Sequence, residues 1–458
     1  MNPYPAIIRL ARSGSPGRAW SMMKEHGLLD ADADPRALTL QARLVKDRAK
    51  HAEAGERARL YADAAALYAK AGALDNASYP LINAASLSLL AGKTDQSVKL
   101  ARDVLAALDA NPDEAETPYW REATRAEALL LHGDEVGART ALRRAVAKQP
   151  AAYEDHAATI GQFELLCEEM GFEAGWLNQI RPPNAVQFAG LMHTAMSEQP
   201  AQRAIADWLE RENIGFGYGA LAAGADIWIS EALAERGAKL HVILPCELTA
   251  FRDLSVTRLD FGWGDRFDRL MSAASDITVL NDAAAPSGAA VQRGDEVALG
   301  MAKRHAAALR SEAKRLRIVG AGDARTPPAP DMSAPTAIVT ATRQPPKRHQ
   351  PSMSGGALRW CVASGGNIGI FKTPAEALLA AKRSATAVAI DYAVAASGDI
   401  APLVEQRVTA MVDCAEQGQC LATQEAAFAL YAASTEMRVE VAGEMRWSGG
   451  AVPLFAII

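Results

Sequence analysis

The chain has 458 residues, of which 49% are hydrophobic, 22% charged and 6% aromatic, and its formal net charge is −6. This length exceeds one ordinary hydrophobic core and predicts two to four domains. The slightly negative charge, with no long run of Lys or Arg, argues against a nucleic-acid-binding protein.

The five cysteines are scattered without a Cys-x-x-Cys spacing, and the eight histidines do not cluster with them. This pattern predicts neither a metal site nor a disulfide framework, and it favours a reduced, cytoplasmic protein. No apolar run approaches the ~20 residues that a membrane-spanning helix needs. The N-terminus also lacks the pattern of a secretory signal, so we expect neither export nor contact with a membrane.

Residues 1–180 are predicted to form a helical domain. From residue 34 to about residue 178, apolar residues such as Leu60, Ala64 and Leu67 recur at helical spacing. Gly92 and Gly133 each follow a pair of leucines and should each end one helix, with a second helix after it. The two glycines lie farther apart than the ~34 residues of a regular tetratricopeptide unit.

Residues 119–150, YWREATRAEALLLHGDEVGARTALRRAVAKQP, resemble a tetratricopeptide repeat that begins at Trp120 and ends at Pro150. Residues 42–72 and 79–92 resemble the helical hairpins known in bacterial proteins as a TRAFs-binding or tetratricopeptide-like domain. The resemblance implies an N-terminal α-helical superhelix whose concave surface holds a protein partner. Alternatively, these repeats only pack against other domains of the same chain.

Residues 181–323 alternate between apolar runs and helical patterns, which predicts a parallel sheet with helices on both faces. Ligands of such sheets bind at the carboxyl ends of the strands. The predicted strands lie near residues 185–193, 240–245, 277–280 and 317–320, and the predicted helices near residues 202–211 and 295–314.

Residues 217–226, GYGALAAGAD, precede a predicted helix. Glycine lets the backbone approach a ligand closely, and a helix N-terminus presents unpaired N–H groups to an anion, so this stretch predicts a phosphate-binding loop. Alternatively, the glycines serve only the packing of helix on sheet, and His193 caps a helix. The predicted ligand contacts are Gly190, His193, Gly217, Tyr218, Gly219, Gly224, Asp226 and Glu231.

Residues 185–323 resemble the SLOG superfamily, a Rossmann-like group related to the DprA and lysine-decarboxylase-like (LOG) proteins. The resemblance implies binding of a nucleotide or a nucleotide derivative. The LOG phosphoribohydrolases carry a second motif, in which a proline and two glycines precede Gly-Thr and a glutamate. Residues 286–288, Pro-Ser-Gly, lack that continuation, which favours binding over N-glycosidic hydrolysis. The matching positions are Gly217, Gly219, Gly224, Asp226, Glu231 and the following AKLHVILP.

Residues 324–356 are rich in Pro, Ser and Thr and predict a linker. The apolar run at residues 337–340 within it is expected to be a strand of the next domain. Residues 357–458 resemble a shortened class III adenylate/guanylate cyclase domain in the segments GALRWCVASGGNIGIF, AVAIDYAVAASGDIA and VAGEMRWSGGAVPLFAII. This resemblance implies a ferredoxin-like α+β fold. An unrelated ferredoxin-like domain is the alternative.

The cyclase resemblance lacks the residues of the reaction. Cyclases hold two divalent ions with two aspartates. The first should follow residues 337–340, where this chain continues Ala-Thr-Arg-Gln, and the second should lie where the chain has Gly365-Gly366-Asn367. The family's transition-state Asn and Arg fall near Gln406 and Ala410. We therefore expect no cyclase activity, and a domain that serves dimerisation or ligand sensing.

The sequence as a whole predicts a multidomain α and α/β signalling protein without assigned catalytic residues. Its ligand would be a nucleotide or nucleotide derivative, its partners a protein or its own domains, and a homodimer would form through the cyclase-like domain. No other cofactor is predicted. Two alternatives stay open: a nucleotide hydrolase in which Asp226 or Glu231 handles protons, and a protein-binding scaffold without a ligand.

Overall fold

The computed structural model describes residues 2–12, 16–50, 52–111, 117–258, 262–280, 283–322, 334–344, 356–395, 401–434, 436–448 and 450–458. The chain divides into two compact units, residues 1–182 and residues 183–458. Each unit is described below by itself.

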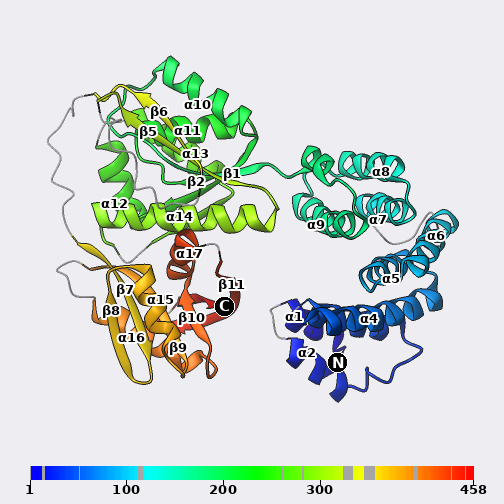
Figure 1. The fold of residues 1–458 in the computed structure, drawn as a ribbon. Coiled ribbons are helices and arrows are strands. Elements are labelled where there is room, and N and C mark those ends of the chain that lie inside the picture. Colours follow the sequence, from blue (N-terminus) through cyan, green and yellow to red (C-terminus); the bar gives the residue numbers. More distant parts are fainter. Residues whose placement is uncertain are drawn as a thin grey trace. The chain divides into compact units, whose positions relative to one another are not determined.

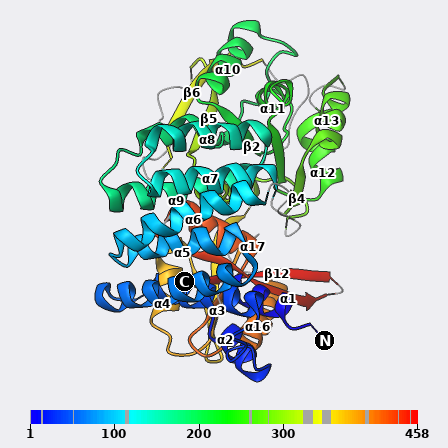
Figure 2. The ribbon, with the colours of Figure 1, turned by 90° about the vertical axis from the view of Figure 1, so that its right-hand side faces the viewer.

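The first unit consists of helices, and α1 to α8 each pack against the next along the chain, whereas α9 packs against α5 and α7 (Figures 1 and 2). Helices α3 to α6 form antiparallel neighbours joined by short turns, and α7 pairs with α8. The helices are α1 (Tyr4–Arg12), α2 (Pro16–Glu25), α3 (Pro35–Ala49), α4 (Ala54–Asp75), α5 (Ser78–Leu90), α6 (Thr94–Ala110), α7 (Pro118–Leu131), α8 (Glu135–Lys148), α9 (Tyr153–Met170) and the 3₁₀ turn η1 (Gly175–Ile180).

Gly92 and Gly133 end helices α5 and α7, as the sequence predicts. Both adopt a left-handed backbone, with φ of 74° and 91°. The amide that follows each glycine donates back to the last helical turn, at 2.8 Å from Lys93 N to Ser88 O and 2.9 Å from Asp134 N to Leu129 O. A residue with a Cβ would be strained in this conformation, which explains glycine at both turns.

The second unit begins with a six-stranded sheet in the order β4-β3-β2-β1-β5-β6. Every neighbouring pair is parallel, which confirms the predicted parallel sheet. The strands β1, β2 and β3 are buried along most of their length, as strands of a sheet covered on both faces are. The strands are β1 (Asn184–Ala189), β2 (Ile214–Gly219), β3 (Lys239–Leu244), β4 (Asp276–Val279), β5 (Ala313–Gly320) and β6 (Thr336–Ala341).

The helices of this sheet are α10 (Gln199–Arg211), α11 (Ala225–Glu235), α12 (Leu248–Arg252), the π-turn η2 (Asp253–Thr257), α13 (Gly262–Ala273) and α14 (Gly288–Ala308). The helix expected near residues 295–314 is therefore shifted. It starts earlier because Ser287 caps it, with Ser287 Oγ accepting from Ala290 N at 3.1 Å. It ends earlier because Arg310 adopts φ of 53°, and Lys314 already belongs to β5.

The strand predicted at residues 337–340 belongs to this first sheet. Strand β6 pairs with β5 from Arg315–Thr336 to Gly320–Ala341. The expectation that it belongs to the C-terminal domain is therefore wrong. The physical reason is that Ala337 and Val339 pack on the core of the first sheet, and Ala341 is buried in it. Residues 324–333 and 345–355 of the predicted linker lie outside the described residues.

A second six-stranded sheet follows, in the order β11-β12-β10-β9-β7-β8. Strands β9 and β10 are parallel, and the other neighbouring pairs are antiparallel. Gly365 and Gly366, both with positive φ, form the tight turn between β7 and β8. Its elements are β7 (Ala357–Ser364), β8 (Asn367–Phe371), α15 (Pro374–Lys382), β9 (Val388–Ala395), α16 (Pro402–Cys414), β10 (Cys420–Thr423), α17 (Gln424–Ala433), β11 (Val439–Trp447) and β12 (Gly450–Ile457).

Helix α14 lies between the two sheets of this unit (Figure 1). One of its sides packs on β1 and β2, and the other packs on α17. Several contacts, including the following three, join it to the second sheet and its helix. Tyr392 Oη donates to Glu296 Oε2 at 2.5 Å, Lys303 Nζ donates to Ala432 O at 2.6 Å, and Gly300 faces the backbone of Phe428.

Candidate functional site

A pocket opens at the carboxyl ends of β1, β2 and β3, between the first turn of α11 and the N-terminal part of α14. It encloses an empty volume of about 560 Å³, part of which is open solvent. All the strand ends lie at this edge because the sheet is parallel. The lining residues are Ala189, Gly190, Met192, Ala220, Ala222, Asp226, Ile243, Pro245, Phe251, Ser255, Val291, Gly294 and Asp295.

Asp226 lies in the first turn of α11, and its side chain accepts two backbone hydrogen bonds. Oδ1 accepts from Gly190 N at 2.5 Å, and Oδ2 accepts from Ala222 N at 3.2 Å. The carboxyl group thereby joins the loop after β1 to the loop after β2. Asp226 is only 7% exposed, so these bonds are made in a region with little water.

Asp295 enters the pocket from α14 and is held by partners on the central strands. Arg317 Nη1 of β5 donates to Asp295 Oδ2 at 2.9 Å, and Gln187 Nε2 of β1 lies 3.4 Å from Oδ1. Arg315 Nε reaches Gln187 Oε1 at 3.4 Å. Burial lowers the pKa of the Arg315 guanidinium to about 10, with a further contribution from Arg317. Asp295, Arg317, Gln187 and Arg315 are thus joined in one hydrogen-bonded network, to which Asp226 is not bonded.

The pKa of Asp226 is raised to about 7. Burial is the largest cause, and the charge of Asp295 adds to it, whereas the amides of Gly190 and Ala222 and the charge of Arg317 oppose it. Burial also raises the pKa of Asp295, against the opposing effect of Arg317. Near neutral pH, Asp226 can therefore both give and take a proton.

Gly190 and Gly224 allow the end of β1 to approach the first turn of α11. A Cβ on Gly190 would lie 2.4 Å from Asp226 N, and a Cβ on Gly224 would lie 2.5 Å from Leu191 O. Gly224 also has φ of 117°, which favours glycine. Of the eight predicted ligand contacts, Gly190 and Asp226 line the pocket.

Gly217 and Gly219 lie within strand β2 rather than in a loop. A Cβ on Gly217 would lie 2.3 Å from Leu233 Cδ1, and a Cβ on Gly219 would lie 2.7 Å from Phe188 O. These glycines let α11 and β1 pack closely on β2, which is the packing role weighed from the sequence. Neither is among the lining residues.

Tyr218 points away from the pocket toward α14. Its hydroxyl pairs with His305 Nδ1, and its ring stacks on His241 with centroids 4.5 Å apart. Burial raises the pKa of Tyr218 and lowers the pKa of His305 to about 4. Tyr218 therefore belongs to a cluster with His241 and His305, on the face of β2 opposite to that of Gly217 and Gly219.

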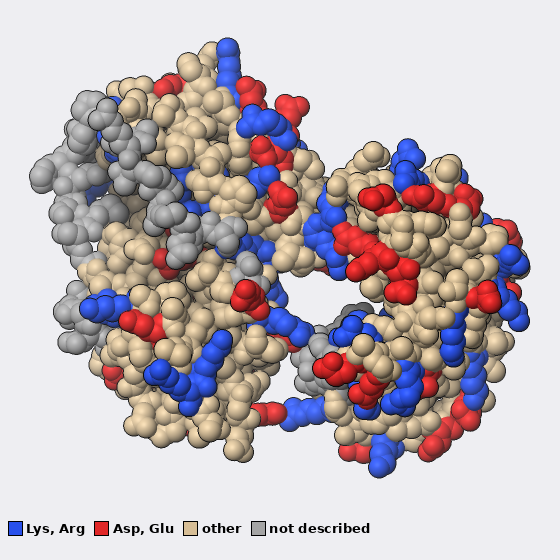
Figure 3. All heavy atoms as spheres, in the orientation of Figure 1, with Lys and Arg blue, Asp and Glu red and all other residues tan. Residues whose placement is uncertain are grey.

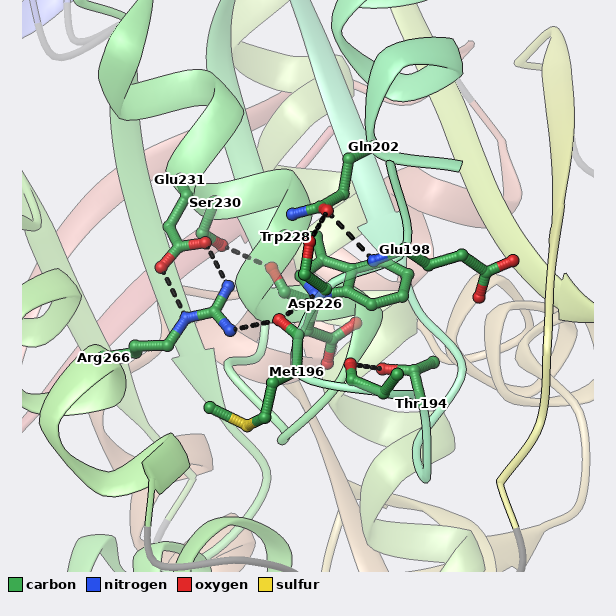
Figure 4. A network of polar contacts seen from close by, with 11 residues as sticks. Thr194, Met196, Glu198, Gln202, Asp226, Trp228, Ser230, Glu231 and Arg266 are labelled. Carbon is green, nitrogen blue, oxygen red and sulfur yellow. Dashed lines mark hydrogen bonds and ion pairs between the residues drawn. The ribbon is translucent and has the colours of Figure 1, made fainter. Parts of the chain in front are cut away.

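Neither Glu231 nor His193 is among the residues that line the pocket. Glu231 supports the loop of residues 190–198 through Arg266 (Figure 4). Glu231 accepts from Arg266 Nε at 2.7 Å, and Arg266 Nη1 donates to Met196 O at 2.8 Å. Trp228 Nε1 donates to the same carbonyl at 3.3 Å. His193 adopts φ of 61°, and its carbonyl accepts from Gln344 N at 2.6 Å.

Amides around the predicted phosphate loop are already engaged within the protein. Asp226 takes the amides of Gly190 and Ala222. Ala223 N donates to Ser255 O at 2.9 Å, and Ala225 N donates to Leu191 O at 3.0 Å. A side-chain carboxyl group therefore stands where the sequence suggested a bound anion.

Sequence reasoning missed Asp295 and the apolar pocket residues Phe251 and Val291. Asp295 lies far from Asp226 along the chain, and no local motif marks it. The order of elements was the available signal, because a helix that follows β4 and returns to β5 must cross the central strands.

In the second sheet, Asp391 of β9 is fully buried and pairs with Arg407 of α16. Arg407 Nε donates to Asp391 Oδ2 at 2.8 Å, and Thr423 Oγ1 donates to Oδ1 at 2.8 Å. Gln406 and Ala410 lie on the same helix α16, while Ala341 belongs to the first sheet. The two positions compared with cyclase metal ligands, Ala341 and the turn at Gly365-Gly366-Asn367, are divided between the two sheets.

Within the residues that the structure describes, no three His, Cys, Asp or Glu side chains come together as a metal site would require. None of the described helices has the length and apolar character needed to cross a membrane. On the face shown in Figure 3, basic and acidic side chains are intermingled, and the described part of that face carries no continuous basic surface.

Residues 6–88 match the family model described as Tetratricopeptide Repeats-Sensor. The match covers α1 to α4 and most of α5, and it supports the prediction of tetratricopeptide-like repeats in the first unit. It begins well before residue 34, where the helical pattern was first recognised in the sequence. A comparison with curated proteins finds no match to the chain.

Proposed function

We propose that residues 183–344 bind a nucleotide or a nucleotide derivative in the pocket at the carboxyl edge of the first sheet, and that the chain is a non-catalytic signalling protein. One observation carries the proposal: a partly open pocket lies at the strand ends of a fully parallel sheet, and its wall contains two carboxyl groups, that of the buried Asp226 and that of the partly exposed Asp295. This is the edge at which such sheets bind their ligands.

The topology of the sheet supports this location. Strands β1 to β4 are added in one direction, and the chain then returns through α14 to place β5 on the other side of β1. The order of strands reverses at β1, and the residues after β1 line the pocket. The resemblance of residues 185–323 to the SLOG superfamily supports a nucleotide-derived ligand.

The other regions would contribute contacts rather than chemistry. Stacked helical hairpins form surfaces that hold peptides or domains, and the matched family's description contains the word sensor. In this proposal the repeats bind a protein partner or other domains of the chain. The cyclase-like C-terminal region would serve assembly, including a homodimer.

The proposal is tested by thermal unfolding of the full chain with AMP, cyclic AMP, ADP-ribose and NAD. Binding to the folded state should raise the unfolding temperature in proportion to ligand concentration. Val291→Trp should abolish the shift, because Val291 lines the pocket and is 39% exposed, so that the indole can fill the opening.

The matched control is Leu248→Trp, since Leu248 is also 39% exposed but lies outside the pocket lining. It should retain the full ligand-induced shift. If none of the four compounds stabilises the wild-type chain, or if Val291→Trp leaves the shift intact, the proposed binding site is wrong.

The raised pKa of Asp226 favours one alternative, a nucleotide hydrolase. A carboxyl group with a pKa of about 7 in a pocket suits general acid or base catalysis. Release of adenine from AMP or ADP-ribose, or of nicotinamide from NAD, together with the corresponding phosphorylated ribose product, would establish this activity if chromatography detects it and Asp226→Asn abolishes it. Binding without product formation would support the non-catalytic protein.

A further inference from the structure

We infer that the pocket binds a neutral, hydroxyl-bearing part of its ligand, namely the ribose of a nucleoside, and that any phosphate group lies outside it. This inference rests on the proposed binding of a nucleotide derivative. It reverses the expectation drawn from the glycine-rich sequence, in which the phosphate was the group recognised.

The charges of the lining carry the first step. The pocket wall contains the carboxyl groups of Asp226 and Asp295, and the described residues of its lining include no Lys, Arg or His. A phosphate placed here would meet Asp295, and also Asp226 whenever Asp226 is ionised, in a partly buried site where like charges repel more strongly than in water. The nearby Arg317 donates to Asp295, so its charge is directed to that carboxyl group.

The hydrogen bonds of the backbone carry the second step. Phosphate sites at helix N-termini depend on N–H groups directed at the anion. Here the amides of Gly190 and Ala222 donate to Asp226, and those of Ala223 and Ala225 donate to backbone carbonyls. The Asp226 carboxyl group therefore already holds the position of the anion.

The carboxyl groups of the pocket can still accept hydrogen bonds, so the pocket suits a ligand that donates them. A carboxylate oxygen can accept two hydrogen bonds, and Asp226 and Asp295 are each fixed by partners behind the pocket wall. Both line the same pocket, and the charge of Asp295 acts on Asp226, so the two carboxyl groups are placed to accept from hydroxyl groups of one sugar. Ile243, Phe251 and Val291 supply an apolar wall for the uncharged faces of the ligand.

The test compares adenosine, guanosine, cytidine and uridine with their 5′-monophosphates by isothermal titration calorimetry on the full chain. For the base that binds, the nucleoside and its monophosphate should have similar affinities. The corresponding 2′,3′-dideoxynucleoside should bind about tenfold more weakly or worse, because it loses hydrogen bonds to charged acceptors.

Asp226→Asn and Asp295→Asn should each weaken nucleoside binding about tenfold. Glu235→Gln is the matched control, since Glu235 is an exposed carboxylate on the same helix as Asp226, and it should leave the affinity unchanged. The ligand series needs no variant, so it decides the question even if one substitution unfolds the chain.

Two results would overturn the inference, and they are distinguishable. If a monophosphate binds at least about tenfold more tightly than its nucleoside, the pocket recognises phosphate and the proposed binding function survives. If neither nucleosides nor nucleotides bind, the proposed function fails and the inference fails with it.

Discussion

Gly300 of α14 faces the backbone carbonyl of Phe428 in α17, and a Cβ on Gly300 would lie 1.8 Å from that oxygen. No side-chain rotation can relieve this contact, because the obstructing atom belongs to the backbone. The approach of the two helices therefore depends on glycine at this position.

Gly300→Ala should destabilise the second unit by about 1–3 kcal/mol or more, because the two helices must separate to admit the methyl group. Thermal unfolding followed by circular dichroism measures the change. Gly322→Ala is the control, since a Cβ there meets nothing within 4 Å. Equal unfolding temperatures for the two variants would contradict the close contact.

The stability of the chain should fall as the pH rises through about 7, because of Asp226. Its folded-state pKa of about 7 exceeds the ordinary value of 3.8, so folding favours the protonated form. This contribution is complete below the unfolded-state pKa and is lost as the pH rises through the folded-state pKa. Asp295 and Arg317 are the other charged groups that act on it.

Asp226→Asn cannot ionise, so its unfolding temperature should vary less with pH between about 5 and 8. It should also be less stable than the wild type at low pH, since the amide nitrogen cannot accept from a backbone N–H. The test is to measure the unfolding temperatures of the wild type and of Asp226→Asn across this pH range. An unchanged pH slope in the variant would show that another group is responsible.

Arg266 is predicted to hold the loop of residues 190–198 in place. Arg266→Ala removes the bonds to Glu231 and to Met196 O, together with the stacking on Trp263 at 4.5 Å. Hydrogen exchange of peptides from this loop should become faster, because the free energy of local opening should fall by about 1–2 kcal/mol. Arg266→Lys keeps the charge but loses the forked geometry of the guanidinium. Its exchange rate in this loop should therefore lie between those of the wild type and Arg266→Ala.

Gly92→Ala should cost about 1–2 kcal/mol, because φ of 74° is unfavourable for a residue with a Cβ. Gly55→Ala, in the first turn of α4, is the matched control. Its Cβ meets nothing within 4 Å, and helix propensity should stabilise that variant by up to about 1 kcal/mol. Urea unfolding of the two variants should therefore shift in opposite directions.

The full chain should form no cyclic AMP or cyclic GMP from ATP or GTP in the presence of Mn²⁺. The positions compared with the two metal-binding aspartates are occupied by Ala341 and the Gly365-Gly366 turn, and they belong to different sheets. A chromatographic assay for both products tests this, and steady product formation would refute the degenerate-site interpretation.

Features encoded by neighbouring residues were predictable from the sequence. The glycines that end α5 and α7, the alternation of strands and helices, and the β7–β8 turn each depend on a few adjacent positions. The place of β6 was not predictable in the same way. Its apolar pattern suits either sheet, and only the packing of Ala337 and Val339 on the first core decides between them.

The candidate site shows the same limit. Gly190 and Asp226 were predicted as ligand contacts, and both line the pocket. Asp226 could be found because it belongs to the short glycine-rich motif, and Gly190 because it follows the end of a predicted strand. Asp295 could not be found locally, since its contact with the site depends on how α14 crosses the sheet. Gly217 and Gly219 were assigned to a loop because glycine has the same signature in a tight turn and in a strand packed closely by a helix.

The burial of α14 on two sides affects how this protein can be divided for experiments. A fragment that stops at residue 344 would expose the surface of α14 that Phe428 and Ala432 cover, and Lys303 would lose its acceptor. Such a truncation is expected to aggregate or to require a solubilising fusion. Fragments intended for crystallisation of the pocket should therefore run from residue 183 to residue 458.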